Sequence, residues 1–246
     1  MAASGNVRYS QLRSGDRSGT GAKVATVTGT LTTDKQLKFD SSGNVVASSE
    51  AIGSGSGQFL VSPIFTPTVP VSGDFAWINQ GGASVTTIGN TIYLDAPYDS
   101  TNVRIRKKTA PATPYTITAA FIPHLPRQNF CRVGLVFRES GSGKLKTFAM
   151  VWNAAPYFHL DAWNSPTSIN STTASGLVYT EHVCFMQISD DGTDRKYRTS
   201  NDGVHWWQWY TETRTTFLTA DEVGFFVSSE ASGYDAGMLL TSWAQS

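Results

Sequence analysis

The stretch ISDDGTDRKYRTSNDGVHWWQWY, from Ile188 to Tyr210, decides the fold of this 246-residue chain. It contains two Asp-Gly pairs, at Asp191 and Asp202, with a short alternating run between them. Asp-Gly favours tight hairpin turns because glycine adopts positive φ without steric cost. The stretch therefore predicts successive antiparallel strands in a sheet rich in aromatic residues. Six of the seven tryptophans lie in the last hundred residues, which extends this prediction to the C-terminal part of the chain.

Alternation of apolar and polar residues recurs on both sides of this stretch at hairpin-like spacing. The candidate strands are Tyr115–Ile122, Cys131–Arg138, Leu145–Trp152, Tyr157–Trp163, Val183–Ser189, Arg195–Ser200, His205–Tyr210, Glu222–Val227 and Met238–Trp243. No segment keeps the period of a helix for more than two turns. So many short strands joined by tight turns predict an all-β fold, an antiparallel β-sandwich or jelly roll over residues 58–246.

Side-chain parity predicts which faces of these strands are buried, because successive residues point to opposite faces. The expected core sets are Cys131, Val133, Leu135 and Phe137 on one strand and Cys184, Met186 and Ile188 on another. We also assign Trp152, Trp206 and Trp243 to the core. Trp77 is expected in the first strand of the sandwich, with its partner strand at Thr91–Leu94.

Residues 1–57 differ in composition from the rest of the chain. They contain no tryptophan and end in the Gly/Ser-rich run AIGSGSG, which is typical of a flexible linker. Alternation around a Ser-Gly-Asn turn at Ser42–Asn44 predicts short extended ribbons, and ribbons of this kind bury little apolar surface alone. We therefore expect an extended N-terminal arm that gains stability by pairing with copies of itself or with a larger particle.

The charge balance excludes whole classes of partner. Nineteen acidic and nineteen basic side chains give no net charge, so we expect binding neither to nucleic acid nor to an anionic membrane. The basic run Arg104, Arg106, Lys107 and Lys108 is expected at a solvated sheet edge. The N-terminus lacks the apolar segment of a secretion signal, and no run is long enough to insert into a membrane, so synthesis in the cytoplasm without a signal peptide is expected.

Metal and cofactor binding are not predicted. The four histidines are scattered, and no cysteine spacing suggests zinc. The turn carboxylates Asp190, Asp191 and Asp194 are expected to cap backbone amides, although calcium, which prefers such oxygens, stays open. Cys131 and Cys184 lie in apolar runs and are expected as buried thiols, with a disulfide between them left open.

The residues GTGAKVATVTGTLTTDKQLKFDSSGNVVAS, from Gly19 to Ser48, resemble the N-terminal segments of bacteriophage tail-fibre and other virion appendage proteins. The match is to a recurring phrase, G-x-L-T followed by K-x-D-x-x-G-N-x-V-x-S. The resemblance implies a protein on the surface of the phage particle, mounted on the tail or the capsid. It also implies that residues 1–57 contact other virion proteins and that the chain forms a homo-oligomer, with a homotrimer expected.

The sandwich carries a second resemblance, in CRVGLVFRE at Cys131–Glu139, KLKTFAMVW at Lys144–Trp152 and FLTADEVGFFVSSEAS at Phe217–Ser232. Together with the opening stretch, these segments resemble the concanavalin-A-like lectin/glucanase family and especially its laminin-G-like members. The shared turn S-x-D-G-x-x-W corresponds here to Ser200, Asp202, Gly203 and Trp206, and the shared strand to Leu218–Phe226. The resemblance implies a lectin-like jelly roll, a fold that serves lectins, hydrolases and spacers alike.

Catalysis is not predicted for this sandwich. Enzymes of the resembling family that cleave glycans carry an E-x-D-x-x-E motif on one strand, which brings an acid and a nucleophile to about 5 Å from each other. The chain has no such triplet, and its glutamates stand apart. It also lacks a G-x-S-x-G nucleophile elbow. We therefore predict that the protein is not an enzyme.

Aromatic residues are the best candidates for a ligand site. Parity places Tyr157, His159, Asp161 and Trp163 on one strand face, with Phe158 and Leu160 on the opposite, buried face. Sugar rings stack on aromatic planes, while Asp161, His159 and the neighbouring Asn164 can hydrogen-bond to hydroxyls. The alternative is that Tyr157 and Trp163 merely cover the sandwich edge.

The HWWQWY cluster offers two further candidates. Parity divides it into one set with Trp206, Gln208 and Tyr210 and another with His205, Trp207 and Trp209, and at least one set must be core. We place Trp207 and Trp209 with the candidate glycan contacts.

Three functions therefore compete. The first is a carbohydrate-binding virion appendage that attaches the particle to a host-surface glycan, without catalysis and without a cofactor. The second is a structural or capsid decoration protein whose sandwich is an exposed spacer. The third, and least favoured, is a glycan-degrading enzyme. The identity of the ligand does not follow from the sequence.

Overall fold

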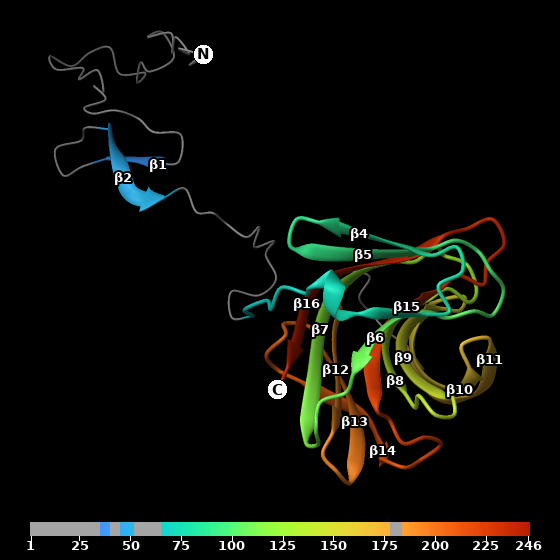
Figure 1. Cartoon of the computed structure of the whole chain (residues 1–246). Coiled ribbons are helices and arrows are strands. Elements are labelled where there is room, and N and C mark those ends of the chain that lie inside the picture. Colours follow the sequence, from blue (N-terminus) through green and yellow to red (C-terminus); the bar gives the residue numbers. More distant parts are fainter. Residues whose placement is uncertain (1–34, 40–44, 52–64, 178–183) are drawn as a thin grey trace, which may run out of the picture. The chain divides into compact units, whose positions relative to one another are not determined.

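The computed structural model of the chain describes residues 35–39, 45–51, 65–177 and 184–246 (Figure 1). The chain divides into two units, Met1–Phe59 and Leu60–Ser246. In the first unit, strands β1 (Lys35–Phe39) and β2 (Val45–Ala51) form an antiparallel two-stranded sheet. The Ser-Gly-Asn turn predicted between them and the remainder of the predicted arm lie outside the described residues.

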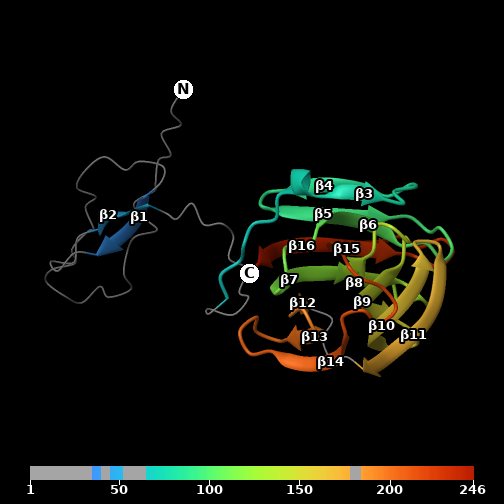
Figure 2. The ribbon, with the colours of Figure 1, turned by 60° about the horizontal axis from the view of Figure 1, so that its bottom comes forward.

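The second unit is built from two seven-stranded antiparallel sheets (Figures 1 and 2). The first sheet has the order β11 (Ser168–Leu177), β10 (Pro156–Ser165), β9 (Leu145–Trp152), β8 (Arg132–Arg138), β15 (Glu222–Ser228), β6 (Arg104–Thr109) and β3 (Ala76–Ile78). The second has the order β14 (Trp207–Thr213), β13 (Asp194–Ser200), β12 (Cys184–Asp190), β7 (Tyr115–His124), β16 (Ala236–Gln245), β5 (Thr91–Ala96) and β4 (Ser84–Ile88). A short 3₁₀ turn, η2 (Ser72–Asp74), precedes β3. The predicted antiparallel sandwich is confirmed.

The main core lies between the sheets and follows the predicted parity. Leu135 and Phe137 of β8 meet Met186 and Ile188 of β12 in one apolar cluster, while Arg132 and Arg138 lie on the opposite face of β8. Both cysteines belong to this core. The Cys131 thiol lies 3.5 Å from the Ser229 hydroxyl and the Cys184 thiol 3.6 Å from the Met150 sulfur, and burial raises the pKa of Cys184 to about 12.

The two Asp-Gly pairs form the turns that the sequence predicts. Gly192 and Gly203 both have positive φ, of 93° and 77°. The Asp191 carboxylate accepts hydrogen bonds from the backbone amides of Asp194 and Thr193 and pairs with Lys196, and these contacts hold its pKa well below the usual range. The acidic turn thus caps its own backbone. Across residues 65–177 and 184–246, no three His, Cys, Asp or Glu side chains lie close enough to hold a metal ion.

The first sheet curls strongly at one side, where β9, β10 and β11 bend round (Figure 1). The turn between β10 and β11 reaches back across the sheet, and the Val103 amide donates a 2.9 Å hydrogen bond to the Pro166 carbonyl. Side chains on the curled face form a second apolar cluster with members from β6, β8, β9, β10 and β15. This cluster therefore covers the face of the first sheet that would otherwise be exposed to solvent. Strand β11 itself was missed from the sequence because SINSTTASGL shows almost no apolar alternation.

Two further predictions about strand positions are wrong. The basic run forms β6, which lies inside the first sheet between β15 and β3, so it is not a sheet edge. Arg104 and Arg106 are buried, and Lys107 pairs with Glu222 at 2.5 Å. Trp77 does lie in the first strand of the sandwich, but its partner is Arg106 of β6, whereas Thr91–Ala96 pairs with β4 and β16.

Candidate functional site

Four of the residues predicted to contact a ligand share one face of β10, as parity indicated. We call Tyr157, His159, Asp161 and Trp163 the β10 face. This face points into the curl of the first sheet, opposite Phe158 and Leu160, which pack toward the main core. Trp163 is 0% exposed and belongs to the second apolar cluster. The prediction that Trp163 stacks on a ligand is therefore wrong, because the curl of the sheet encloses its ring.

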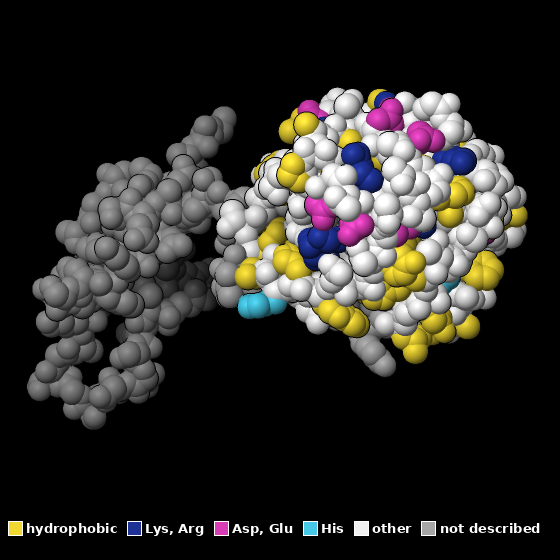
Figure 3. Space-filling view, turned by 90° about the horizontal axis from the view of Figure 1, so that it is seen from below, with side chains coloured by type: hydrophobic (Ala, Val, Ile, Leu, Met, Phe, Trp, Pro, Cys, Tyr) yellow, Lys and Arg dark blue, Asp and Glu magenta, His cyan; other side chains and the backbone are white. Residues whose placement is uncertain are grey.

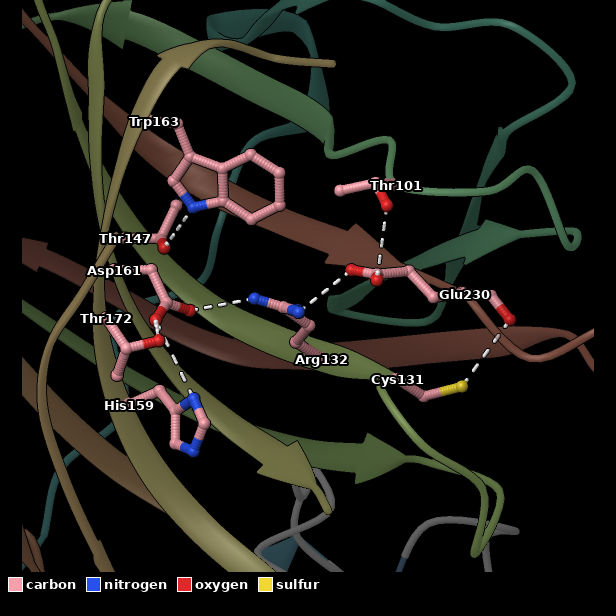
Figure 4. A network of polar contacts seen from close by, with 10 residues as sticks. Thr101, Cys131, Arg132, Thr147, His159, Asp161, Trp163, Thr172 and Glu230 are labelled. Atoms are coloured by element: carbon pink, nitrogen blue, oxygen red, sulfur yellow. Dashed lines mark hydrogen bonds and ion pairs between the residues drawn. The ribbon is translucent and has the colours of Figure 1, made fainter. Parts of the chain in front are cut away.

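The polar members of the β10 face belong to a closed network (Figure 4). The Arg132 guanidinium bridges two carboxylates, with 2.9 Å to Asp161 and 2.9 Å to Glu230. Thr172 of β11 donates a 2.7 Å hydrogen bond to the other oxygen of Asp161. The network ties β8, β10 and β11 to the segment that follows β15, and so it fixes the curl.

The same network shifts the pKa of both carboxylates, Asp161 and Glu230. Burial alone would raise the pKa of Asp161, but hydrogen bonds and charge from His159, Arg132 and Thr172 outweigh it and lower the pKa. Burial raises the pKa of Glu230, against the opposing charge of Arg132. Asp161 is 0% exposed, so this carboxylate serves as a structural link, and only Glu230 of the pair is partly exposed.

Trp163 and His159 complete this packing. The Trp163 indole donates a 3.0 Å hydrogen bond to the Thr147 hydroxyl, and the Arg132 guanidinium lies 5.2 Å from the centre of its ring. His159 is buried with Nδ1 3.7 Å from Asp161, and its ring meets Tyr157 edge to face at 5.9 Å. Of the predicted residues on β10, only the half-buried Tyr157 and the exposed Asn164 reach solvent.

The HWWQWY cluster does not keep its predicted parity. The pairing of β13 with β14 shifts between Tyr197 and Arg198, so that Trp209 is an extra residue in a β-bulge. Trp209 and Tyr210 consequently both pack toward the main core, and Trp209 stacks on Phe148 with ring centres 5.5 Å apart. Trp207 is 71% exposed. Trp207 and Trp209 thus do not form one ligand face, and Trp206 is half-buried, not fully enclosed as predicted.

A second group of buried charges lies between the sheets. Glu212 contacts Lys146 at 3.0 Å and Arg195 at 3.1 Å, and it accepts a 2.7 Å hydrogen bond from the Tyr197 hydroxyl. Burial lowers the pKa of Lys146 and raises the pKa of Tyr197. All four side chains are enclosed, so this group links the sheets and offers no surface to a ligand.

An open pocket lies elsewhere, among loops that the sequence analysis did not single out. It has a volume of about 460 Å³, within the range of ~300–1,000 Å³ usual for small-molecule sites. We call it the loop pocket. Its walls are Pro123–Arg127 at the end of β7 and after it, Met150–Trp152 at the end of β9, Pro156, and Asp235 before β16.

Trp152 gives the loop pocket an aromatic wall. The prediction that Trp152 is core is wrong, because this indole is half-buried and lines the pocket. The Arg127 guanidinium lies 5.5 Å from the centre of its ring. The sequence could have indicated this pocket through FIPHLPRQNF (residues 121–130), in which two prolines flank a histidine between two predicted strands.

Acidic groups stand beside the loop pocket. The His124 ring lies 5.3 Å from the ring of Tyr93, and the Tyr93 hydroxyl donates a 3.4 Å hydrogen bond to Asp95. Burial, followed by the charge of Asp235, raises the pKa of Asp95. Two carboxylates, an imidazole and a guanidinium are thus grouped at or next to this pocket.

Comparison with known proteins finds structures of similar fold but identifies no family. No protein-family model matches the chain, and no curated protein matches it. Among solved structures, a Saccharomyces cerevisiae protein described as functionally unknown matches with a TM-score of 0.57 at 11% identity, over 71% of this chain and 96% of that one. The GH43 protein BlXynB from Bacillus licheniformis matches with a TM-score of 0.58 at 12% identity, over 86% of this chain.

The chain spans 46% of the BlXynB protein, less than half of its length. Lectin II from Ulex europaeus is also similar, with a TM-score of 0.48 at 13% identity, over 74% of this chain and 96% of the lectin. At these identities the likenesses concern the fold alone. The two sheets and the matches to the yeast protein and BlXynB define the class of the fold as an antiparallel β-sandwich.

Proposed function

We propose that the protein is a non-enzymatic virion appendage subunit. In this proposal the sandwich binds a host-surface glycan, and residues 1–57 anchor the chain to other virion proteins on the particle surface. The observation that carries the glycan part is the loop pocket, because it combines an indole wall with hydrogen-bonding side chains from His124, Arg127 and Asp235. Aromatic rings with a few convergent polar groups are the usual means by which a protein surface holds a sugar.

The composition of the surface agrees with such a role. In the face shown in Figure 3, uncharged side chains and backbone predominate, and hydrophobic side chains and a few acidic and basic groups lie between them. Such a surface does not hold its partner by net charge, and this favours an uncharged, hydroxyl-rich ligand. Among the residues predicted from the sequence, Trp207, Tyr157 and Asn164 remain proposed secondary contacts for a longer glycan.

The anchoring part rests on the resemblance of Gly19–Ser48 to tail-fibre segments. Its support in the structure is the separate two-stranded sheet of β1 and β2, since a lone hairpin is marginally stable in water and gains from pairing with other chains. A homotrimer held through these residues is part of the proposal. Native mass spectrometry of the full chain measures the oligomeric state directly.

Binding of the fluorescently labelled full chain to host cells, and to polysaccharide extracted from them, tests the first part. We expect saturable binding that the polysaccharide competes away, with no new reducing ends after prolonged incubation. For the second part, we expect a chain that lacks residues 1–57 to be absent from particles assembled in its presence. Absence of binding to any host cell or glycan, or incorporation of the shortened chain, contradicts the corresponding part.

One observation favours the second candidate, a decoration protein with the sandwich as spacer. The curl of the first sheet encloses His159, Asp161 and Trp163, which removes three of the seven predicted ligand contacts. A particle that lacks the protein would then lose physical stability while host attachment stayed unchanged. Measuring both properties on the same particles separates the two candidates.

A further inference from the structure

The walls of the loop pocket suit a ligand with an apolar face. Trp152, Leu125 and three prolines, at 123, 126 and 156, supply half of the lining residues. Prolines keep such a wall rigid because their φ is fixed. A pyranose ring presents C–H groups on one face, and these pack on an indole. With one indole in the lining, the pocket has one stacking position.

The polar groups suit hydroxyls. Asp235 accepts hydrogen bonds, Arg127 donates several from a planar group, and His124 can do both. Neighbouring hydroxyls of a sugar act as donor and acceptor at once, so they can contact a carboxylate and a guanidinium together. These three side chains come from two segments, the end of β7 with the loop after it and the loop before β16, which are more than a hundred residues apart in the chain.

The charges at this end of the molecule disfavour an acidic ligand. The lining holds one charge of each sign, Arg127 and Asp235. The Tyr93 ring that contacts His124 also donates a hydrogen bond to Asp95, which adds a second carboxylate beside the pocket. Asp235 is close enough to Asp95 for its charge to favour protonation of that group. The carboxylate of a sugar acid in the pocket would be repelled by the Asp235 carboxylate in the same way.

Resting on the proposed glycan-binding function, we infer that the loop pocket holds one neutral sugar unit. One face of this unit lies against Trp152, and its hydroxyls bond to Asp235, Arg127 and His124. Selection against sugar acids comes from the Asp235 and Asp95 carboxylates. The rest of the glycan extends out of the pocket.

The test uses the full chain and a panel of methyl glycosides at equal concentration. The neutral probes are those of glucose, galactose, mannose and N-acetylglucosamine, and the acidic probes are those of glucuronic acid and N-acetylneuraminic acid. Saturation-transfer NMR and titration calorimetry measure binding. We expect at least one neutral glycoside to bind, and the acids to bind about tenfold more weakly or not at all.

Variants locate the site. Trp152→Ala and Asp235→Asn should each weaken the neutral glycoside about tenfold or more. The matched control for the first is Trp77→Ala, because Trp77 is also half-buried with an arginine, Arg106, 4.9 Å from its ring centre. Asp74→Asn, at an exposed aspartate on η2, is the control for the second. Both controls should keep wild-type affinity.

The outcomes separate this inference from the proposed function. Tighter binding of the acidic glycosides, or full affinity in both pocket variants, overturns the inference while glycan binding stands. Binding of host polysaccharide with no binding of any glycoside overturns it as well. If the full chain binds neither glycoside, polysaccharide nor host cells, both the inference and the proposed glycan-binding function are overturned. Asp235 is exposed, so D235N gives a result even if W152A does not fold.

Discussion

The β10 face and the loop pocket both combine aromatic rings with polar side chains, yet one is closed and the other open. On the β10 face the Arg132 guanidinium lies between two carboxylates and the Trp163 indole donates a hydrogen bond to Thr147. In the loop pocket about 460 Å³ remains unfilled next to Trp152. Aromatic and polar composition alone therefore does not define a ligand site. What distinguishes the two regions is that the curl of the sheet encloses the β10 face, whereas the loop pocket is open to solvent.

The largest effect that can test this contrast comes from Trp163→Ala. We expect the free energy of unfolding to fall by about 3–5 kcal/mol, because the substitution leaves a cavity in the second apolar cluster. Urea unfolding followed by fluorescence and circular dichroism measures the loss. Glycan binding by the folded fraction should persist. A stable W163A protein that has lost binding would make the β10 face the ligand site after all.

A smaller effect is expected from Asp161→Asn, which removes the charge that faces Arg132. Loss of a buried charge-assisted hydrogen bond should cost about 1–3 kcal/mol at pH 7. The pKa of Asp161 is lowered in the folded protein, so its contribution is fully present above about pH 4 and disappears as the pH falls through the folded pKa.

The stability difference between wild type and D161N should therefore shrink below about pH 4. Urea titrations at a series of pH values measure this trend. The control is Asp74→Asn, since Asp74 is exposed on η2 and its pair with Lys108 is open to solvent. A difference that is constant with pH would mean that the pKa of Asp161 is the same in the folded and unfolded chains.

The smallest effect is expected from Trp207→Ala. Its side chain is 71% exposed, so the free energy of unfolding should change by about 0.5 kcal/mol or less. If Trp207 is a secondary contact, the variant binds host polysaccharide more weakly but methyl glycosides as well as wild type does. Comparing the two ligands on one preparation decides this. A loss of glycoside binding in W207A would instead place the primary site on β14.

Much of the sandwich could be predicted from local patterns. The alternation in Leu145–Trp152 predicted β9 with its observed bounds, and the Asp-Gly pairs predicted the turns on either side of β13. These features depend on neighbouring residues only. Strand β11 could not be found in the same way, because its register comes from pairing with β10 and not from its own polar sequence.

The predicted ligand contacts on β10 and β14 differ from the structure for reasons that do not lie in the local sequence. Parity placed Trp163 on the correct face, but the curl that covers it involves contacts between distant segments, such as the hydrogen bond from Val103 to Pro166. The bulge at Trp209 changes the phase of β14, and a single strand gives no sign of it. The walls of the loop pocket come from residues 123–127, 150–152, 156 and 235, which only the tertiary fold brings together.

The places of β15 and β16 in the two sheets have a consequence for folding. β15 lies between β8 and β6, and β16 lies between β7 and β5, so each sheet consists of two separate halves until residues 222–245 join them. Contacts between residues so far apart in the chain make folding slow, because long loops must close before strand pairing stabilises them. During synthesis the earlier strands therefore expose unpaired edges until these two strands emerge from the ribosome. A nascent chain arrested before Glu222 should remain sensitive to protease and depend on chaperones, while release of the last strands should bring protection in one cooperative step.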